Sequence, residues 1–228
     1  MNALAIDCAV SKMTVAAKKD KNIVKVTYDI GIKQSEKLLP AIDFVMKEAG
    51  LTPAELDYTC TTLGPGTFTG LRLGLSALKA LNLANGTPVY GIPSLDAYAH
   101  PYSTAVETVL SVIEAKEDEF FYAFYLRGEK LREEEDKEIE EILKQVDPES
   151  CVMVCGPGAK TFTDRTSEIT PLYSVHSFNP QGDCTESLFE MTEKMIADKI
   201  SPMEDYDGPL YVRKSEAEIV LEQKKAGK

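Results

Sequence analysis

The sequence predicts an α/β protein with two halves, each a mixed sheet covered by helices. Three β-prone runs, at 3–6, 14–17 and 23–28, open the chain and are separated by short links, as in antiparallel strands. Helical segments then alternate with single strands, which requires crossover connections and parallel pairing. Two further β-prone runs, 108–114 and 119–126, begin the second half. Hairpins followed by crossovers give a mixed sheet.

The first helix is predicted over 35–49, where Gly50 ends it. Its apolar positions keep helical spacing, and they are Leu38, Leu39, Ile42, Val45, Met46 and Ala49. Ala41 and Phe44 lie off that stripe. This helix therefore has apolar surface beyond the stripe that would face its own sheet.

A strand over 57–63, the turn Gly64-Pro65-Gly66 and a long apolar helix form the centre of the first half. One stripe of this helix consists of Phe68, Leu71, Leu75 and Leu78. A second, smoother stripe consists of Gly70, Gly74, Ala77 and Leu81. We expect the first stripe to pack on the sheet and the second to suit close approach by another helix. Composition alone equally allows a helix buried between two layers of its own domain.

The remaining elements divide the chain into a lobe at 1–100 and a smaller lobe at 101–228. A strand at 88–92 and a helix at 94–99 complete the first lobe. The acidic run 133–141 is read as a solvated face, or as a docking site for a basic partner. In the second lobe we expect a strand at 151–154, a helix that begins after Gly156-Pro157-Gly158 and another helix at 186–199. An extended segment at 209–213 and a polar, helix-prone tail at 215–228, which packs only partly, should follow.

Composition limits the kinds of partner and compartment. The chain has 228 residues, of which 43% are hydrophobic. Its formal net charge of -12 disfavours binding to nucleic-acid phosphates without a partner protein. Five cysteines without a Cys-x-x-Cys pair are typical of reduced thiols. The first residues lack a basic signal-peptide start, and no apolar run approaches the ~20 residues that span a bilayer. We expect a cytoplasmic protein that does not contact membranes.

The two glycine turns could cradle phosphates through backbone N–H groups and helix N-termini. The candidate nucleotide-binding residues are Asp7, Gly64, Gly66, Thr67, Gly156 and Gly158. The alternative reading makes Asp7 a turn or cap residue and the turns purely structural, since no Walker motif is present. His100 and His176 are the only histidines, and neither a zinc-protease motif nor a nucleophile elbow occurs. The sequence therefore predicts no metal site, no required cofactor and no independent enzyme.

Several motifs resemble the TsaB family, also called YeaZ. They are Ile6-Asp7, Leu38-Leu39-Pro40, Leu-Gly-Pro-Gly-Thr-Phe-Thr-Gly-Leu-Arg-Leu-Gly at 63–74, Pro-Val-Tyr-Gly-Ile at 88–92 with Ser94-Leu95, and Pro-Leu-Tyr-Val-Arg at 209–213. The resemblance covers the first hundred residues strongly and the second half weakly. It implies the ribonuclease-H-like, actin-like fold of the ASKHA superfamily, to which the order of elements also corresponds.

The resemblance further implies a non-catalytic subunit of the machinery that makes threonylcarbamoyladenosine in tRNA. In that family TsaB pairs with the catalytic paralogue TsaD, or with a second copy of itself, through a bundle of two N-terminal helices from each chain. TsaE joins through the TsaB–TsaD complex, and tRNA is met only within it. The implied interface residues are Leu38, Leu39, Ile42, Val45, Met46, Phe68, Leu71, Gly74, Leu75 and Leu78.

Catalytic relatives carry a metal-binding His-x-x-x-His, and those two positions correspond here to Ser94 and Tyr98. The first loop reads Asp7-Cys8-Ala9 where the family commonly has Asp-Thr-Ser, so two hydroxyls that could meet phosphate are missing. Two other functions stay open at this point. One is an ATP-dependent small-molecule phosphotransferase of the sugar-kinase type, and the other is a metallopeptidase.

Overall fold

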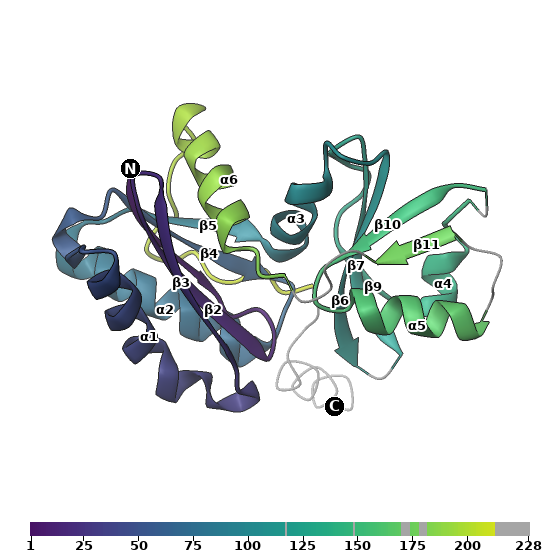
Figure 1. Ribbon diagram of the computed structural model, residues 1–228, viewed down its shortest axis with the longest axis horizontal. Helices are drawn as coiled ribbons and strands as arrows, with labels where there is room; N and C mark the ends of the chain where they lie inside the picture. The colour runs from purple at the N-terminus through teal and green to yellow at the C-terminus, as the bar shows by residue number, and fades with distance from the viewer. Residues whose placement is uncertain (117, 148, 170–173, 178–181, 213–228) are drawn as a thin grey trace, which may run out of the picture.

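The computed structural model describes residues 1–116, 118–147, 149–169, 174–177 and 182–212, which form two lobes side by side (Figure 1). The strands of the first lobe are β1 (Asn2–Asp7), β2 (Lys12–Lys19), β3 (Asn22–Asp29), β4 (Tyr58–Gly64) and β5 (Val89–Pro93). They form a sheet in the order β3-β2-β1-β4-β5. The hairpin strands β1, β2 and β3 are antiparallel, whereas β4 and β5 run parallel to β1. The predicted mixed sheet is confirmed.

Helices cover both faces of this first sheet (Figure 1). One face carries α1 (Gln34–Glu48) and α2 (Phe68–Asn85), which also contact each other. The opposite face carries α3 (Ser94–Ala99) and α6 (Thr185–Ala197). Single 3₁₀ turns occupy Gly31–Lys33, Pro53–Glu55 and His100–Tyr102.

The second lobe is built on a six-stranded mixed sheet. Its strands are β6 (Thr108–Lys116), β7 (Glu119–Leu126), β8 (Glu129–Lys130), β9 (Glu135–Glu138), β10 (Cys151–Cys155) and β11 (Ser174–Ser177). They follow the order β11-β10-β6-β7-β8, and β9 also pairs with β7. Two helices, α4 (Ile139–Leu143) and α5 (Ala159–Ile169), belong to this lobe. The α/β fold class with two mixed sheets is therefore confirmed.

The acidic run is divided between two elements. Its residues 135–138 form β9, which pairs with β7, and Ile139 then begins α4 with its side chain buried. Alternate carboxylates of a strand point to opposite faces, so the run does not present one charged helical surface.

The chain returns to the first lobe after residue 182, contrary to the predicted division at residue 100. The α6 helix packs on β1, β4 and β5. Glu193 of α6 accepts hydrogen bonds from the Lys18 ammonium at 2.6 Å and from the Tyr58 hydroxyl at 3.0 Å. Assigning all of 101–228 to the second lobe was wrong, because the apolar side of α6 covers a sheet face that the first hundred residues leave open. The predicted tail, 215–228, lies outside the described residues.

Residues 203–211, called here the strap, run along the first lobe. The Met203 amide donates to the Val89 carbonyl and the Leu210 amide to the Leu63 carbonyl, both at 2.8 Å. Lys79 of α2 donates from its ammonium to three strap carbonyl oxygens, those of Glu204, Asp205 and Asp207, at 3.0, 2.6 and 2.6 Å. These bonds fasten the strap to both the sheet and α2.

One hydrophobic core passes through both lobes by way of α3. It includes Tyr58 and Ile92 on the first sheet, Leu95 on α3, and Val109 and Ala123 on the second sheet. A polar contact joins the same elements, since Asp96 of α3 accepts a hydrogen bond from the Tyr125 hydroxyl at 2.5 Å and pairs with Lys130 at 2.7 Å. Among the described residues, no helix is both long and apolar enough to cross a bilayer.

Candidate functional site

The small residues of α2 face its own sheet. A Cβ atom added to Gly70 would lie 2.0 Å from the Cys8 carbonyl oxygen, and one added to Gly74 would lie 3.2 Å from a methyl group of Ile6. Leu71, on the neighbouring stripe, is 1% exposed. For Gly70 and Gly74, the prediction that the smooth stripe suits close approach by another helix is wrong, because the close approach occurs within this chain, against β1 and the loop after it. Ala77 and Leu81 of the same stripe are only half-buried.

Seven of the ten predicted interface residues lie inside the first lobe. They are Leu38, Val45, Met46, Leu71, Gly74, Leu75 and Leu78. Their burial contradicts the idea that they form an open surface. Phe68 is half-buried, and its ring stacks on Tyr211 of the strap with 4.2 Å between centroids and 8° between planes. Of the ten, Leu39 and Ile42 keep substantial exposure.

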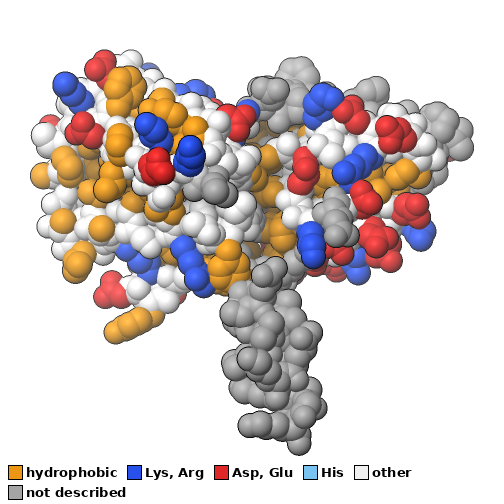
Figure 2. Space-filling model, turned by 90° about the horizontal axis from the view of Figure 1, so that it is seen from below, with side chains coloured by type: hydrophobic (Ala, Val, Ile, Leu, Met, Phe, Trp, Pro, Cys, Tyr) orange, Lys and Arg blue, Asp and Glu red, His pale blue; other side chains and the backbone are white. Residues whose placement is uncertain are grey.

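Other apolar side chains are exposed on α1 and α2. Leu39 is 68% exposed, Phe44 48% and Leu83 89%. Three half-buried residues spaced four apart, Leu73, Ala77 and Leu81, follow one edge of α2, and Ile42 is half-buried on α1. We call these seven residues the α1/α2 face. Figure 2, seen from the side on which these helices lie, shows apolar side chains spread over that lobe.

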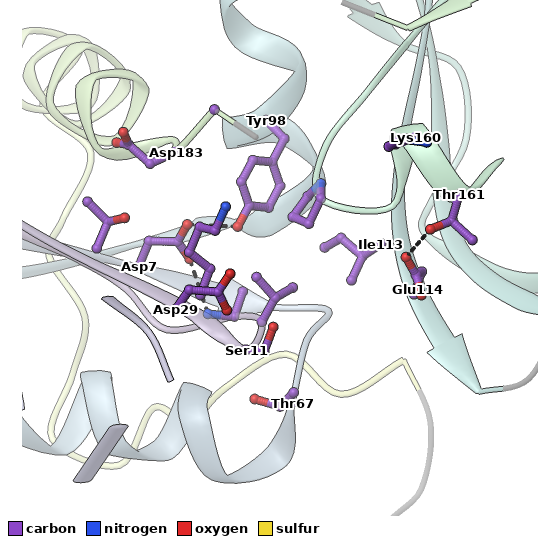
Figure 3. A pocket seen from close by; sticks show the side chains of 16 residues that line it. Asp7, Ser11, Asp29, Thr67, Tyr98, Ile113, Glu114, Lys160, Thr161 and Asp183 are labelled. Atoms are coloured by element: carbon purple, nitrogen blue, oxygen red, sulfur yellow. Dashed lines mark hydrogen bonds between the residues drawn. The ribbon is translucent and has the colours of Figure 1, made fainter. Parts of the chain in front are cut away.

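A pocket of about 420 Å³ opens between the lobes (Figure 3). Asp7, Lys12, Asp29, Thr67 and Tyr98 line it from the first lobe. Ile113, Glu114, Pro157, Lys160 and Thr161 line it from the second lobe, and Gly182 and Asp183 lie where the chain crosses back. The topology thus brings together Asp7 and Thr67, the only two of the six predicted nucleotide-binding residues among the residues that line the pocket.

The glycine turns are filled by the chain itself. A Cβ atom on Gly64 would lie 2.2 Å from the Leu210 carbonyl oxygen, and one on Gly156 would lie 2.5 Å from that of Val112. Gly66 and Gly158 meet backbone atoms at 2.5 and 3.0 Å in the same way. The Thr67 amide donates to the Ala9 carbonyl at 2.6 Å. Close backbone packing therefore explains these glycines without a phosphate.

Asp7 is enclosed by hydrogen-bond donors. Its Oδ1 accepts from the Ala9 amide and the Thr62 hydroxyl, both at 3.1 Å. Its Oδ2 accepts from the Tyr98 hydroxyl at 2.7 Å and the Cys184 thiol at 3.2 Å. Burial raises the pKa of this carboxyl above its ordinary value, although the four hydrogen bonds act to lower it. Figure 3 shows the Tyr98 hydroxyl directed at the carboxylate.

The residues present do not fit a magnesium-bound nucleotide held through Asp7. A cation would have to displace the Tyr98 hydroxyl and the Cys184 thiol, since both carboxylate oxygens are already bonded. The other charged groups on the pocket wall are three acidic and two basic, a balance that does not attract phosphate. Within the described part of the chain, no three His, Cys, Asp or Glu side chains come together as a metal-binding set.

The two positions of the relatives' histidine pair have structural roles here. Ser94 is fully buried, and its hydroxyl oxygen accepts a hydrogen bond from the Gly64 amide at 3.1 Å. Tyr98 is 6% exposed and holds Asp7. Sequence reasoning missed the roles of Tyr98 and Cys184 because they join Asp7 from 91 and 177 residues away.

Comparison with known proteins agrees with this fold. Residues 31–173, more than half of the chain, match the family model described as TsaD, tRNA N6-adenosine threonylcarbamoyltransferase. A relative named tRNA threonylcarbamoyladenosine biosynthesis protein TsaB, from Buchnera aphidicola, is 30% identical over 130 residues, 56% of this chain and 62% of the relative. The protein of the same name from Escherichia coli is 27% identical over 132 residues, 57% of each. The chain belongs to the TsaD-like family, within its TsaB/YeaZ group.

Solved structures of the TsaB/YeaZ group extend the likeness over the whole fold. YeaZ from Pseudomonas aeruginosa superposes with a TM-score of 0.75 at 21% identity, covering 92% of this chain and 99% of that one. A protein of Bacteroides thetaiotaomicron with an actin-like ATPase fold and unknown function gives 0.51 at 11% identity, covering 83% and 95%. The predicted TsaB/YeaZ resemblance and the actin-like fold are both confirmed. The chain spans 57 to 62% of the length of the two curated TsaB relatives it matches.

Proposed function

We propose that this chain is a non-catalytic TsaB-type subunit in the biosynthesis of threonylcarbamoyladenosine in tRNA. It acts by binding a TsaD-type catalytic subunit in the cytoplasm, and a TsaE-type ATPase and tRNA meet it within that complex. The names of the relatives from two bacteria and the description of the matching family model support the pathway.

The observation that carries the proposal is the α1/α2 face. Leu39 and Leu83 are 68% and 89% exposed, which leaves two large aliphatic side chains of adjacent helices in water. Fully burying such a side chain contributes roughly 1.5 to 3 kcal/mol, from which the cost of association is subtracted. We infer that these exposed side chains contact a pair of partner helices, either from a TsaD-type subunit or from a second copy of this chain.

An accessory role also fits the chemistry between the lobes. Ser94 and Tyr98 stand where catalytic relatives have metal ligands, and both are committed to hydrogen bonds inside the protein. These two side chains argue against a metallopeptidase, and the hydrogen bonds that enclose Asp7 argue against an ATP-dependent phosphotransferase.

The test measures molar mass by light scattering, with the chain alone and mixed with TsaD from the same cell, at ~150 mM salt to screen weak charge contacts. We expect a mixed complex whose affinity falls about tenfold or more, ~1.4 kcal/mol, in Leu39→Asp and in Leu83→Asp. Ile169→Asp is the matched control, because Ile169 is 45% exposed but lies on α5 of the second lobe.

Two results would overturn the proposal. One is the absence of any complex when ATP and tRNA are also supplied. The other is unchanged affinity in both α1/α2 variants, provided that each variant unfolds as the wild type does. Tight ATP binding with phosphorylation of a small molecule by the isolated chain would favour the phosphotransferase instead.

A further inference from the structure

A second concave site lies on the second lobe. This groove, of about 260 Å³, is lined by Tyr122, Ala123 and Phe124 of β7. It is also lined by Leu131, Arg132 and Glu133, which follow β8, and by Glu135, which begins β9. Gln145 and Val146, which follow α4, line it as well. It shares no residue with the pocket between the lobes or with the α1/α2 face. The proposed function therefore leaves the groove unexplained.

The groove wall exposes large apolar side chains. Leu126 is 41% exposed and Leu131 54%, and both line the groove beside the half-buried ring of Phe124. Single exposed leucines are ordinary on protein surfaces, but two that converge on a concave apolar site indicate a binding region. The volume falls below the ~300 Å³ at which pockets for drug-sized ligands begin, so it suits an inserted side chain better than a nucleotide.

A polar chain fixes one side of this groove. The side-chain Nε2 of Gln145 donates to the Tyr122 hydroxyl oxygen at 2.8 Å, and that hydroxyl donates to Glu135 Oε2 at 3.0 Å. Burial raises the pKa of Tyr122, so the hydroxyl remains a donor at neutral pH. The Glu135 carboxylate is thereby held at the groove wall.

The charges around the groove have one dominant sign. Glu133, Glu135 and Asp147 line it, against the single cation Arg132. Lys130, close by in sequence, is paired with Asp96 and Glu134. An acidic rim favours a cationic partner and disfavours nucleic acid. A second copy of this chain, with a formal net charge of -12, is a poor match for the same reason.

We propose that this groove docks a peptide segment of another protein, in which one large apolar side chain is flanked by Lys or Arg. The apolar side chain lies against Phe124, Leu126 and Leu131. The flanking cations pair with the carboxylates of Glu133, Glu135 and Asp147. This site adds a second protein contact, separate from the proposed helical interface.

The experiment titrates the ¹⁵N-labelled full chain with three blocked peptides and follows backbone amide shifts. The probe is acetyl-Lys-Phe-Lys-amide, acetyl-Lys-Ser-Lys-amide lacks the apolar anchor, and acetyl-Glu-Phe-Glu-amide reverses the charge. We expect saturable shifts confined to 122–126, 131–135 and 145–147 with the probe. Binding of either control peptide should be about tenfold weaker or worse, ~1.4 kcal/mol.

Variants make the assignment specific. Leu131→Ser and Glu133→Gln should each weaken the probe severalfold, whereas Ile169→Ser, an exposed apolar position on α5, should leave it unchanged. Equal shifts with all three peptides, shifts centred on Asp7 and Thr67, or full binding by Leu131→Ser would each overturn the proposal. Failure here leaves the TsaD test intact, since the two surfaces share no residue.

Discussion

The Tyr98 hydroxyl of α3 donates a 2.7 Å hydrogen bond to Oδ2 of Asp7 at the end of β1. Both residues are almost fully buried, at 6% and 3% exposure. The bond connects the first sheet to the helix that also packs on the second sheet, so it lies where the two lobes meet.

Replacing Tyr98 by Phe should destabilise the protein by about 1–3 kcal/mol, because a buried carboxylate loses its shortest hydrogen bond without gaining water. Urea unfolding at pH 7 measures the change. Tyr90→Phe is the matched control, since Tyr90 is 7% exposed and lies on β5, the strand that leads into α3. Equal stability of Tyr98→Phe and wild type would show that the bond to Asp7 contributes nothing.

Asp7→Asn should alter how stability depends on pH. Since burial raises the pKa of Asp7 in the folded protein above the ordinary 3.8, the folded state binds the proton more tightly than the unfolded state does. The associated stabilisation is fully present below pH 3.8 and is lost as pH rises through the folded-state pKa. Asn cannot titrate. The free energy of unfolding of the wild type should therefore exceed that of Asp7→Asn by about 1–3 kcal/mol at the acid end, and this difference should shrink as pH rises.

The measurement is a set of urea unfolding curves for both proteins between pH 4 and pH 8. A stability difference between wild type and Asp7→Asn that grows as pH rises would contradict the raised pKa of Asp7, because it would mean a folded-state pKa below the ordinary value.

Gly74→Leu should damage folding rather than any helix partner. A single Cβ at Gly74 already lies 3.2 Å from Ile6 and from the Thr61 hydroxyl oxygen, so a Leu side chain overfills the contact between α2 and the sheet. We expect a loss of about 1–3 kcal/mol, seen as a lower midpoint of thermal unfolding. Ser76→Leu, on the exposed side of α2, should change the midpoint little. A Gly74→Leu protein as stable as wild type would return this stripe to the list of candidate interfaces.

Lys79→Met should loosen the strap. The ammonium donates to three strap carbonyls, and Met keeps the length of the side chain without the donors. We expect hydrogen-exchange protection of the Met203 and Leu210 amides to fall by about tenfold, ~1.4 kcal/mol, while protection in β1 is kept. Lys47→Met, an exposed lysine of α1, serves as control. Unchanged protection of both amides would mean that the backbone bonds to Val89 and Leu63 hold the strap alone.

Sequence reasoning succeeded where structure depends on near neighbours. The hairpin strands, the helix after Gly66 and the two mixed sheets follow from local periodicity and turn residues, and the family resemblance follows from short motifs, of which the one at 63–74 is the longest. It failed on which face of a helix is covered. Ala41 lies off the apolar stripe but is buried, because a small side chain lets α1 lie close to the sheet, whereas Leu39 on the stripe is exposed, as its predicted place in an interface requires.

Long-range relationships account for the other errors. Nothing in the sequence near Thr185 indicates that α6 returns to β1, since the helix carries the same amphipathic pattern wherever it packs. The enclosure of Asp7 by Cys184 depends on that return. From the sequence alone, a carboxylate such as Asp7 at the end of the first strand suggests a ligand-binding group, because the hydrogen-bond donors that surround it are not apparent.

The core that runs through α3 has a mechanical consequence. Leu95 and its neighbours belong to both lobes at once, and Asp96 anchors Tyr125 and Lys130 of the second sheet. The α3 helix cannot separate from either lobe without exposing apolar surface, so the two lobes should move as one rigid body. The α1/α2 face and the groove beside β7 lie on different lobes of that body. They would then hold their proposed partners at a constant separation and angle.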